Sequence, residues 1–211
     1  DLVVLDFFIG NDLADNARPG LLQVIDGELV EHEVPRGFLP LWARGFLSRH
    51  SHLYHFLWPY QRMILGGREA MRKEQRNALA TYGPEGDGRV WDVSRRYIDE
   101  TIAVARKHGV PIAIVLIPDP LQVDEPRFSK LLSSLDLSPA EYTRATPDAR
   151  LAEIGTDARV PVLDLLPAFE RTPDPVSLYF ALDKHWTPAG HALAAEEMAR
   201  FLVAEALVPV P

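Results

Sequence analysis

Asp183 and His185 lie two positions apart near the C-terminal end of the sequence. A carboxylate beside an imidazole can accept a hydrogen bond from one ring nitrogen, fix the tautomer and leave the other nitrogen free to take a proton from a nucleophile. Thr187 and Pro188 follow as a helix N-cap and first helical residue, so the pair is expected in a short turn before a helix. Because Asp-x-His is common by chance, the alternative is that Asp183 caps a turn and His185 packs on Trp186.

A second polar stretch follows an apolar run near the other end of the sequence. Residues 2–9 are almost continuously apolar and lead into Gly10, Asn11 and Asp12. Such a run is typical of a strand buried on both faces of a parallel sheet, and open α/β sheets bind ligands at the carboxyl ends of their strands. Gly10 offers a backbone N–H and Asn11 a side-chain amide, which are the donors that a developing oxyanion needs. A Gly-Asn-Asp turn by itself is a weak signal.

Together the two stretches resemble the SGNH/GDSL hydrolase superfamily. In that family a Gly-x-Asn-Asp-like block follows a core strand, and an Asp-x-x-His or Asp-x-His-Trp block precedes the last helix. The single residue between Asp183 and His185 is similar to the Asp-x-His-Trp branch, which includes alginate O-acetyltransferase-like proteins. The resemblance implies that Asp183 and His185 are two members of a Ser-His-Asp triad and that Asn11 is an oxyanion donor. It also implies that Gly10 and Asp12 form the turn around Asn11.

The nucleophile that this resemblance implies is absent from the sequence. In the family it is a serine in a Gly-Asp-Ser block on an earlier strand, and no serine here follows Gly-Asp after an apolar strand. We therefore expect the chain to be the C-terminal part of a larger catalytic domain. The serine would then lie on a missing N-terminal segment or on a companion chain.

The resemblance implies a serine esterase or acyl hydrolase that acts on O-acyl esters, with acetylated carbohydrates as one substrate class. A polysaccharide O-acetyltransferase with the same triad is an alternative, and so is a non-catalytic SGNH-like binding protein that keeps the fold without the serine. Triad chemistry needs no metal or organic cofactor. The pocket candidates are Asp119, which lies between two prolines after an apolar run, and Trp186. For Asp119 a simple turn role is the alternative.

The apolar periodicity predicts an α/β fold in which helices alternate with parallel strands. Strands are expected at 2–9, 111–117 and 160–164, and helices at 92–108, 147–156 and 188–206. A further helix start is predicted at Ser138-Pro139-Ala140-Glu141. The resemblance implies a three-layer α/β/α, flavodoxin-like sheet of about five strands in the order 2-1-3-4-5. This chain would supply the last three, and the missing central strand would pair with the edge of the first.

Residues 21–88 are expected to be an insertion within a single domain that spans residues 1–211. Two short apolar segments flank Asp26-Gly27, which is a strong hairpin signal, and residues 37–82 read as helix interrupted by prolines. His50, His52 and His55 do not share one helical face, and no carboxylate lies among them, so we expect no metal site there.

Composition narrows the classes of partner. The sequence has 22 Lys and Arg against 30 Asp and Glu, a formal net charge of −8, which disfavours nucleic acid or an anionic membrane as the main partner. The absence of cysteine excludes disulfides and thiol nucleophiles. No apolar run reaches the ~18 residues expected of a membrane span. The compartment stays open, with export in a bacterium as one alternative.

Overall fold

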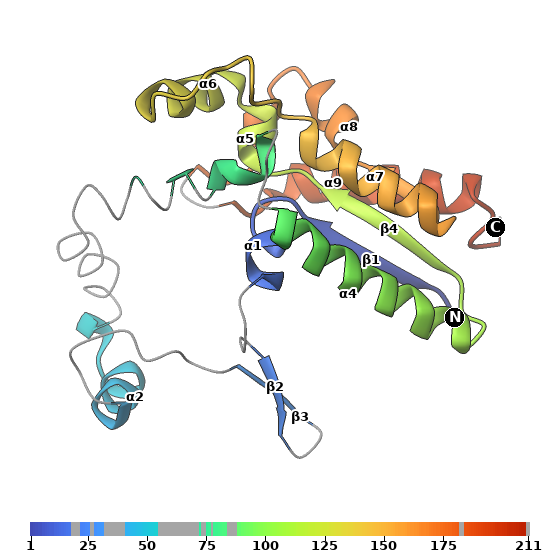
Figure 1. Cartoon of the computed structure of the whole chain (residues 1–211), viewed down its shortest axis with the longest axis horizontal. Helices are drawn as coiled ribbons and strands as arrows, with labels where there is room; N and C mark the ends of the chain where they lie inside the picture. The colour runs from blue at the N-terminus through green and yellow to red at the C-terminus, as the bar shows by residue number, and fades with distance from the viewer. Residues whose placement is uncertain are drawn as a thin grey trace. The chain divides into compact units, whose positions relative to one another are not determined.

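The computed structural model describes residues 1–17, 22–25, 28–31, 41–54, 72, 75–76, 78–83, 88–181 and 184–209. The chain divides into two compact units. One contains residues 1–17 and 78–211, and the other contains residues 18–77 (Figure 1).

The first unit is built on a three-stranded parallel sheet. Its strands are β1 (Val3–Phe8), β4 (Ile112–Ile117) and β5 (Val162–Asp164), in the order β1-β4-β5. Val3 pairs with Ile112, and Ile114 pairs with Val162. The central strand β4 is buried along nearly its whole length, as its unbroken apolar run predicts. The sheet confirms the predicted α/β fold, and its order agrees with the last three strands of a 2-1-3-4-5 sheet.

Helices cover the two faces of this sheet and complete three layers. One face packs against α4 (Gly88–Lys107) and α7 (Thr146–Ala158) through the alternating side chains of Ile112, Ile114 and Leu116. The other face presents Val115 to α8 (Leu166–Glu170) and α9 (Pro188–Ala204). Figure 1 shows α4 and α7 lying along β1 and β4. The shorter elements are α1 (Asp12–Asn16), η1 (Ala80–Tyr82), α5 (Pro120–Val123), α6 (Glu125–Ser134) and η2 (Pro175–Leu178).

The helix ends follow local backbone chemistry. At the end of α4, Gly109 has φ +67°, Val110 N–H donates to Ala105 O and Gly109 N–H donates to Arg106 O, which is a Schellman motif. The end of α7 has the same bonds around Arg159, which adopts φ 53° although it is not glycine.

The predicted helix start at Ser138 is wrong. Residues 139–141 form a turn in which Glu141 N–H donates to Ser138 O, and the next helix begins at Thr146. Residues 138–141 are all exposed, so a helix there would have no apolar face to bury, and that burial supplies most of a short helix's stability in a protein.

The second unit contains β2 (Leu22–Ile25) paired antiparallel with β3 (Glu28–Glu31), and α2 (Leu41–His50). Ile25 pairs with Glu28, so the predicted hairpin is present. His55 and most of the interval 55–77 lie outside the described residues. Among the described helices, none is long and apolar enough to cross a membrane.

Candidate active site

The turn after β1 carries three of the predicted site residues. Phe8 N–H donates to the Asp12 carboxylate over 2.8 Å, so Asp12 closes the turn onto the end of the strand. Asn11 is exposed and precedes α1, and its side-chain amide donates to Asp15 Oδ2 over 2.8 Å. A side-chain amide has two N–H groups, so this bond orients the group and uses one of them.

Gly10 lies where no side chain fits. A Cβ atom at this position would lie 2.4 Å from Asp119 Oδ2 and 2.5 Å from the Phe8 ring. The backbone of the β1 turn therefore approaches the end of β4 more closely than any other residue type would allow.

Asp119, a predicted pocket residue, is buried and serves as the N-cap of α5. Its Oδ1 accepts from Leu121 N–H over 2.8 Å, and its own N–H donates to Gln122 Oε1 over 2.9 Å. Pro120 occupies the first helical position, which completes a capping box. The second carboxylate oxygen of Asp119 accepts from Lys184 Nζ over 2.8 Å.

The turn that carries His185 is closed by a short antiparallel contact. Tyr179 and Trp186 form an isolated β-bridge, and Phe180 N–H donates to His185 O over 3.0 Å. The His185 side chain is exposed. Asp183 lies outside the described residues, so its predicted contact with His185 stays a prediction.

Trp186 packs into the core beneath this turn. Its ring lies 5.3 Å from the Phe169 ring and 5.5 Å from the His191 ring, centroid to centroid, and it joins the apolar cluster of α8 and α9. The structure therefore places the Trp186 side chain as a support for the His185 turn.

Lys184 brings the separate parts of the site together. Its Nζ donates to Gly10 O over 3.2 Å and to Asp119 Oδ2 over 2.8 Å, so the turns after β1 and β4 meet the turn before α9. The first two turns lie at the carboxyl end of the sheet, where ligands of this fold class bind. Nothing in the sequence singled out Lys184, since its partners are distant along the chain.

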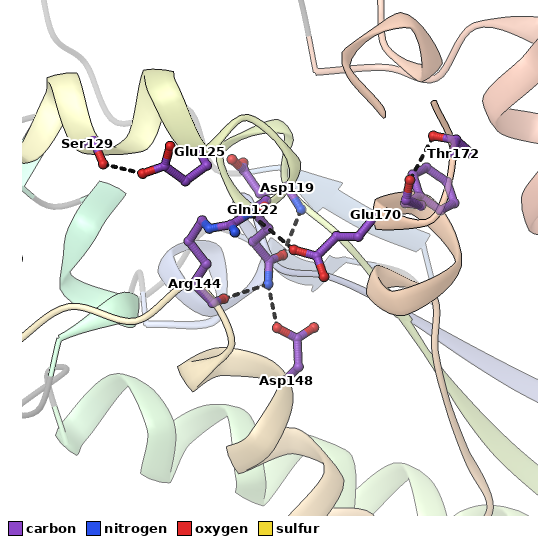
Figure 2. A network of polar contacts seen from close by, with 9 residues as sticks. Asp119, Gln122, Glu125, Ser129, Arg144, Asp148, Glu170 and Thr172 are labelled. Atoms are coloured by element: carbon purple, nitrogen blue, oxygen red, sulfur yellow. Dashed lines mark hydrogen bonds and ion pairs between the residues drawn. The ribbon is translucent and has the colours of Figure 1, made fainter. Parts of the chain in front are cut away.

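A polar network continues from Asp119 into the interior (Figure 2). Gln122 Nε2 donates to Arg144 O over 2.9 Å and to the Asp148 carboxylate, and Arg144 forms an ion pair with Glu170 over 3.1 Å. Burial, followed by repulsion from Asp164, raises the pKa of Asp148 to about 7. The pattern Asp119-Pro120-x-Gln122 could have revealed the cap from sequence, but not the partners of Gln122.

A hollow of about 40 Å³ lies next to the His185 turn. Its lining comes from α5, α6 and the segment that leads to the turn, and includes Arg127, Tyr179 and Phe180. In the part of the chain that the structure describes, no three His, Cys, Asp or Glu side chains are grouped so as to hold a metal ion.

The sequence profile of the SGNH hydrolase-like domain of the acetyltransferase AlgX matches residues 90–209, which is more than half of the chain. The chain therefore belongs to this SGNH hydrolase-like family, and the predicted resemblance is confirmed. Membership points to hydrolase or acyltransferase activity. The matched region contains Asp119, Asp183 and His185, whereas the Asn11 turn lies before it.

One crystal structure is similar at 23% identity over 56% of this chain and 53% of its own, with a TM-score of 0.39. The chain spans about half the length of that protein. No curated protein matches.

Proposed function

We propose that this chain supplies the base, the base-orienting carboxylate and an oxyanion donor of a serine-dependent esterase that acts on O-acyl esters. The observation that carries the proposal is the contact of Lys184 with Gly10 O, because it joins the His185 turn to the Asn11 turn at the carboxyl end of the sheet. Family membership supplies the reaction class.

In the proposed mechanism a serine Oγ attacks the ester carbonyl while His185 takes its proton. Asp183 orients the imidazole, and the free N–H of the Asn11 amide stabilises the oxyanion. The carbonyl–alkoxy bond then breaks, and His185 returns the proton to the leaving alcohol. Water activated by His185 releases the acyl group and regenerates the serine.

The outer edge of β1 pairs with no strand among the described residues, and it suggests where the serine comes from. Val3 and Ile9 donate their N–H groups to the β4 side, so in a parallel ladder the N–H groups of Val4 and Asp6 point to the opposite edge. Phe8 N–H, on that same edge, already bonds Asp12. We propose that an apolar strand ending in the serine pairs with Val4 and Asp6 and stops before Phe8, as part of a preceding segment or a companion chain.

The surface beside this edge suits such a strand. The apolar run at residues 2–9 predicts a strand that is buried on both faces. In the structure, however, Val3, Val4 and Leu5 are only half-buried. A groove of about 520 Å³ opens next to β1 and is lined by apolar side chains that include Val3, Tyr97 and Val104. Tyr97 and Val104 are exposed on α4 and would be covered by the element that follows or precedes the added strand.

An O-acetyltransferase is the second candidate, because the matched family profile describes the domain of an acetyltransferase. The same residues would serve, with a carbohydrate hydroxyl in place of water as the acceptor of the acyl group. Assaying an acetyl donor with and without a polysaccharide acceptor separates the two reactions. Failure of both would favour a non-catalytic binding protein.

The test uses the full natural protein with 4-nitrophenyl acetate. We expect His185→Ala to lower turnover by more than about 10³-fold, since the residue acts in both proton transfers. Asn11→Ala should lower turnover roughly 10²–10³-fold, as loss of one oxyanion donor does elsewhere. His52→Ala, an exposed histidine just after α2, is the matched control and should be neutral. Wild-type turnover in His185→Ala would overturn the proposal.

The serine itself is located by intact-mass measurement and N-terminal sequencing of the natural protein and everything that co-purifies with it. We expect a Gly-Asp-Ser block after an apolar strand. A complete natural preparation without such a block would contradict the esterase and leave the binding protein.

A further inference from the structure

Lys184 lies between the two predicted triad residues, yet its side chain points to other parts of the site. The ammonium is 2.8 Å from Asp119 Oδ2, 3.2 Å from Gly10 O and 6.0 Å from the centroid of the Phe8 ring. These partners come from the two strand ends that frame the site. An exposed lysine gains little stability from an ordinary surface ion pair. The convergence of three partners on the Lys184 ammonium group therefore needs an explanation.

The anchor of Lys184 is a rigid one. The Asp119 side chain is 2% exposed, whereas that of Lys184 is 49% exposed. Asp119 is held in place by Leu121 N–H and Gln122, and Gln122 is in turn held by Arg144 and Asp148. A buried carboxylate needs a partner for its charge, and Lys184 supplies it.

The contact with Gly10 fixes a peptide plane of the oxyanion turn. The Gly10–Asn11 peptide is planar and trans, so a carbonyl turned toward Lys184 turns the Asn11 N–H the opposite way. The side chain of Asn11 is separately held by Asp15. Backbone and side chain of the predicted oxyanion donor are therefore both constrained.

We propose that Lys184 is a positioning residue of the acyl-transfer site, holding the His185 turn at a fixed distance from the Asn11 turn through Gly10 O and the buried Asp119. The inference rests on the proposed function. Lys184 touches no reacting atom in this role. Its effect is on the geometry between base and oxyanion donor, where a displacement of about 1 Å can cost roughly 10²-fold in rate.

The first experiment tests the contact without using activity. In the full natural protein, the NMR shift of the Gly10 carbonyl carbon should change in Lys184→Met and in Asp119→Asn, and should stay near its wild-type value in Lys184→Arg. Asn at position 119 can still accept from Leu121 N–H, so the α5 cap is kept. Lys130→Met, on the exposed face of α6, is the matched control. An unchanged Gly10 carbonyl in Lys184→Met would overturn the inference.

The second experiment tests positioning through kinetics. Lys184→Met should lower kcat about 10-fold while KM stays within about twofold, because ground-state binding is kept and transition-state alignment is lost. Lys184→Arg should retain most of the wild-type kcat. The double variant Lys184→Met/Asp119→Asn should be no slower than the slower single variant, since each single change already removes the contact between Lys184 and Asp119. Wild-type kcat in Lys184→Met, or additive losses in the double variant, would overturn the positioning role.

The two experiments separate this inference from the proposed function. A wild-type protein without ester turnover or acyl transfer would overturn the proposed function and, with it, positioning for catalysis, whatever the Gly10 carbonyl shows. If the wild-type protein is active but the NMR shift of the Gly10 carbonyl carbon does not change in Lys184→Met, the inference is overturned and the proposed function stands.

Discussion

Asp148 shows how the interior beneath the site constrains a single residue. One of its carboxylate oxygens accepts from Gln122, and the other meets no donor among the described residues. Burial raises the pKa of Asp148 from 3.8 in an unfolded chain to about 7. The folded protein therefore holds the proton more tightly than the unfolded chain, so this stabilisation is complete at low pH and is lost as pH rises from about 4 to about 7.

Asp148→Asn should remove that pH dependence. Asn still accepts from Gln122 and has no proton to release, so the variant should keep the stability of up to about 4 kcal/mol that the wild type loses between about pH 4 and about pH 8. Urea unfolding of both proteins at about pH 5 and about pH 8 measures the difference. Asp99→Asn, an exposed site on α4, should leave the pH dependence unchanged. Parallel stability profiles for wild type and Asp148→Asn would contradict the prediction.

Gly10→Ala should disturb the site through contact alone. The added methyl group meets the carboxylate of Asp119 and the Phe8 ring, so we expect a loss of about 1–3 kcal/mol in unfolding free energy and a fall in activity. Gly88→Ala is the matched control, because its Cβ meets nothing within 4 Å and it lies in α4, where Ala is favoured. Equal stability of the two alanine variants would argue against the close approach.

Local sequence patterns located the turns of the candidate site better than the contacts between those turns. Gly10, Asn11 and Asp12 were placed correctly after a core strand because an apolar run and a turn are local signals. Lys184 was missed because its partners lie 65 and 174 positions away. Asp119 was expected at the pocket but is buried as a cap, since only the tertiary fold decides whether a turn carboxylate faces solvent.

At the scale of elements, two helix ends with the same hydrogen bonds differ in residue type. The helix that was predicted to end at residue 108 ends at Lys107, and Gly109 takes the left-handed conformation just after it. The end of α7 was expected near residue 156 but lies at Ala158, because Arg159 gives no sequence signal for the left-handed conformation that it adopts.

Exchanging the two residue types should have opposite effects on stability. Gly109→Ala should lose about 1 kcal/mol in unfolding free energy, since the backbone is left-handed and no neighbour lies near the new methyl group. Arg159→Gly should gain up to about 1 kcal/mol by relieving the same strain. Thermal unfolding of both variants measures the pair. A destabilised Arg159→Gly would mean that the Arg159 side chain contributes more than its backbone costs.

At the scale of the whole molecule, the outer edge of β1 pairs with no other strand among the described residues, and we expect this edge to affect behaviour in solution. An apolar edge strand with unpaired N–H groups pairs readily with other chains unless it is covered. The predicted sheet order located this edge from the sequence. The segment that covers this edge could not be predicted from local sequence patterns, because strand pairing depends on segments that are distant in sequence.

The 211-residue chain by itself should self-associate through this edge. Val4→Pro removes an N–H that faces away from β4, so it should reduce association without breaking the β1–β4 ladder. Val4→Ala is the control that loses side-chain volume but keeps the N–H. Sedimentation velocity distinguishes them. Equal association of the two variants would place the contact elsewhere.

The bond between Lys184 and Gly10 O joins residues 174 positions apart. During synthesis, at about 5–20 residues per second, the Asn11 turn therefore emerges from the ribosome many seconds before its counterpart. A nascent chain cannot assemble the proposed site until Lys184 and His185, which lie just before α9, have been translated. A message truncated before the codon for His185 would yield a protein that holds the Asn11 turn but lacks the proposed base.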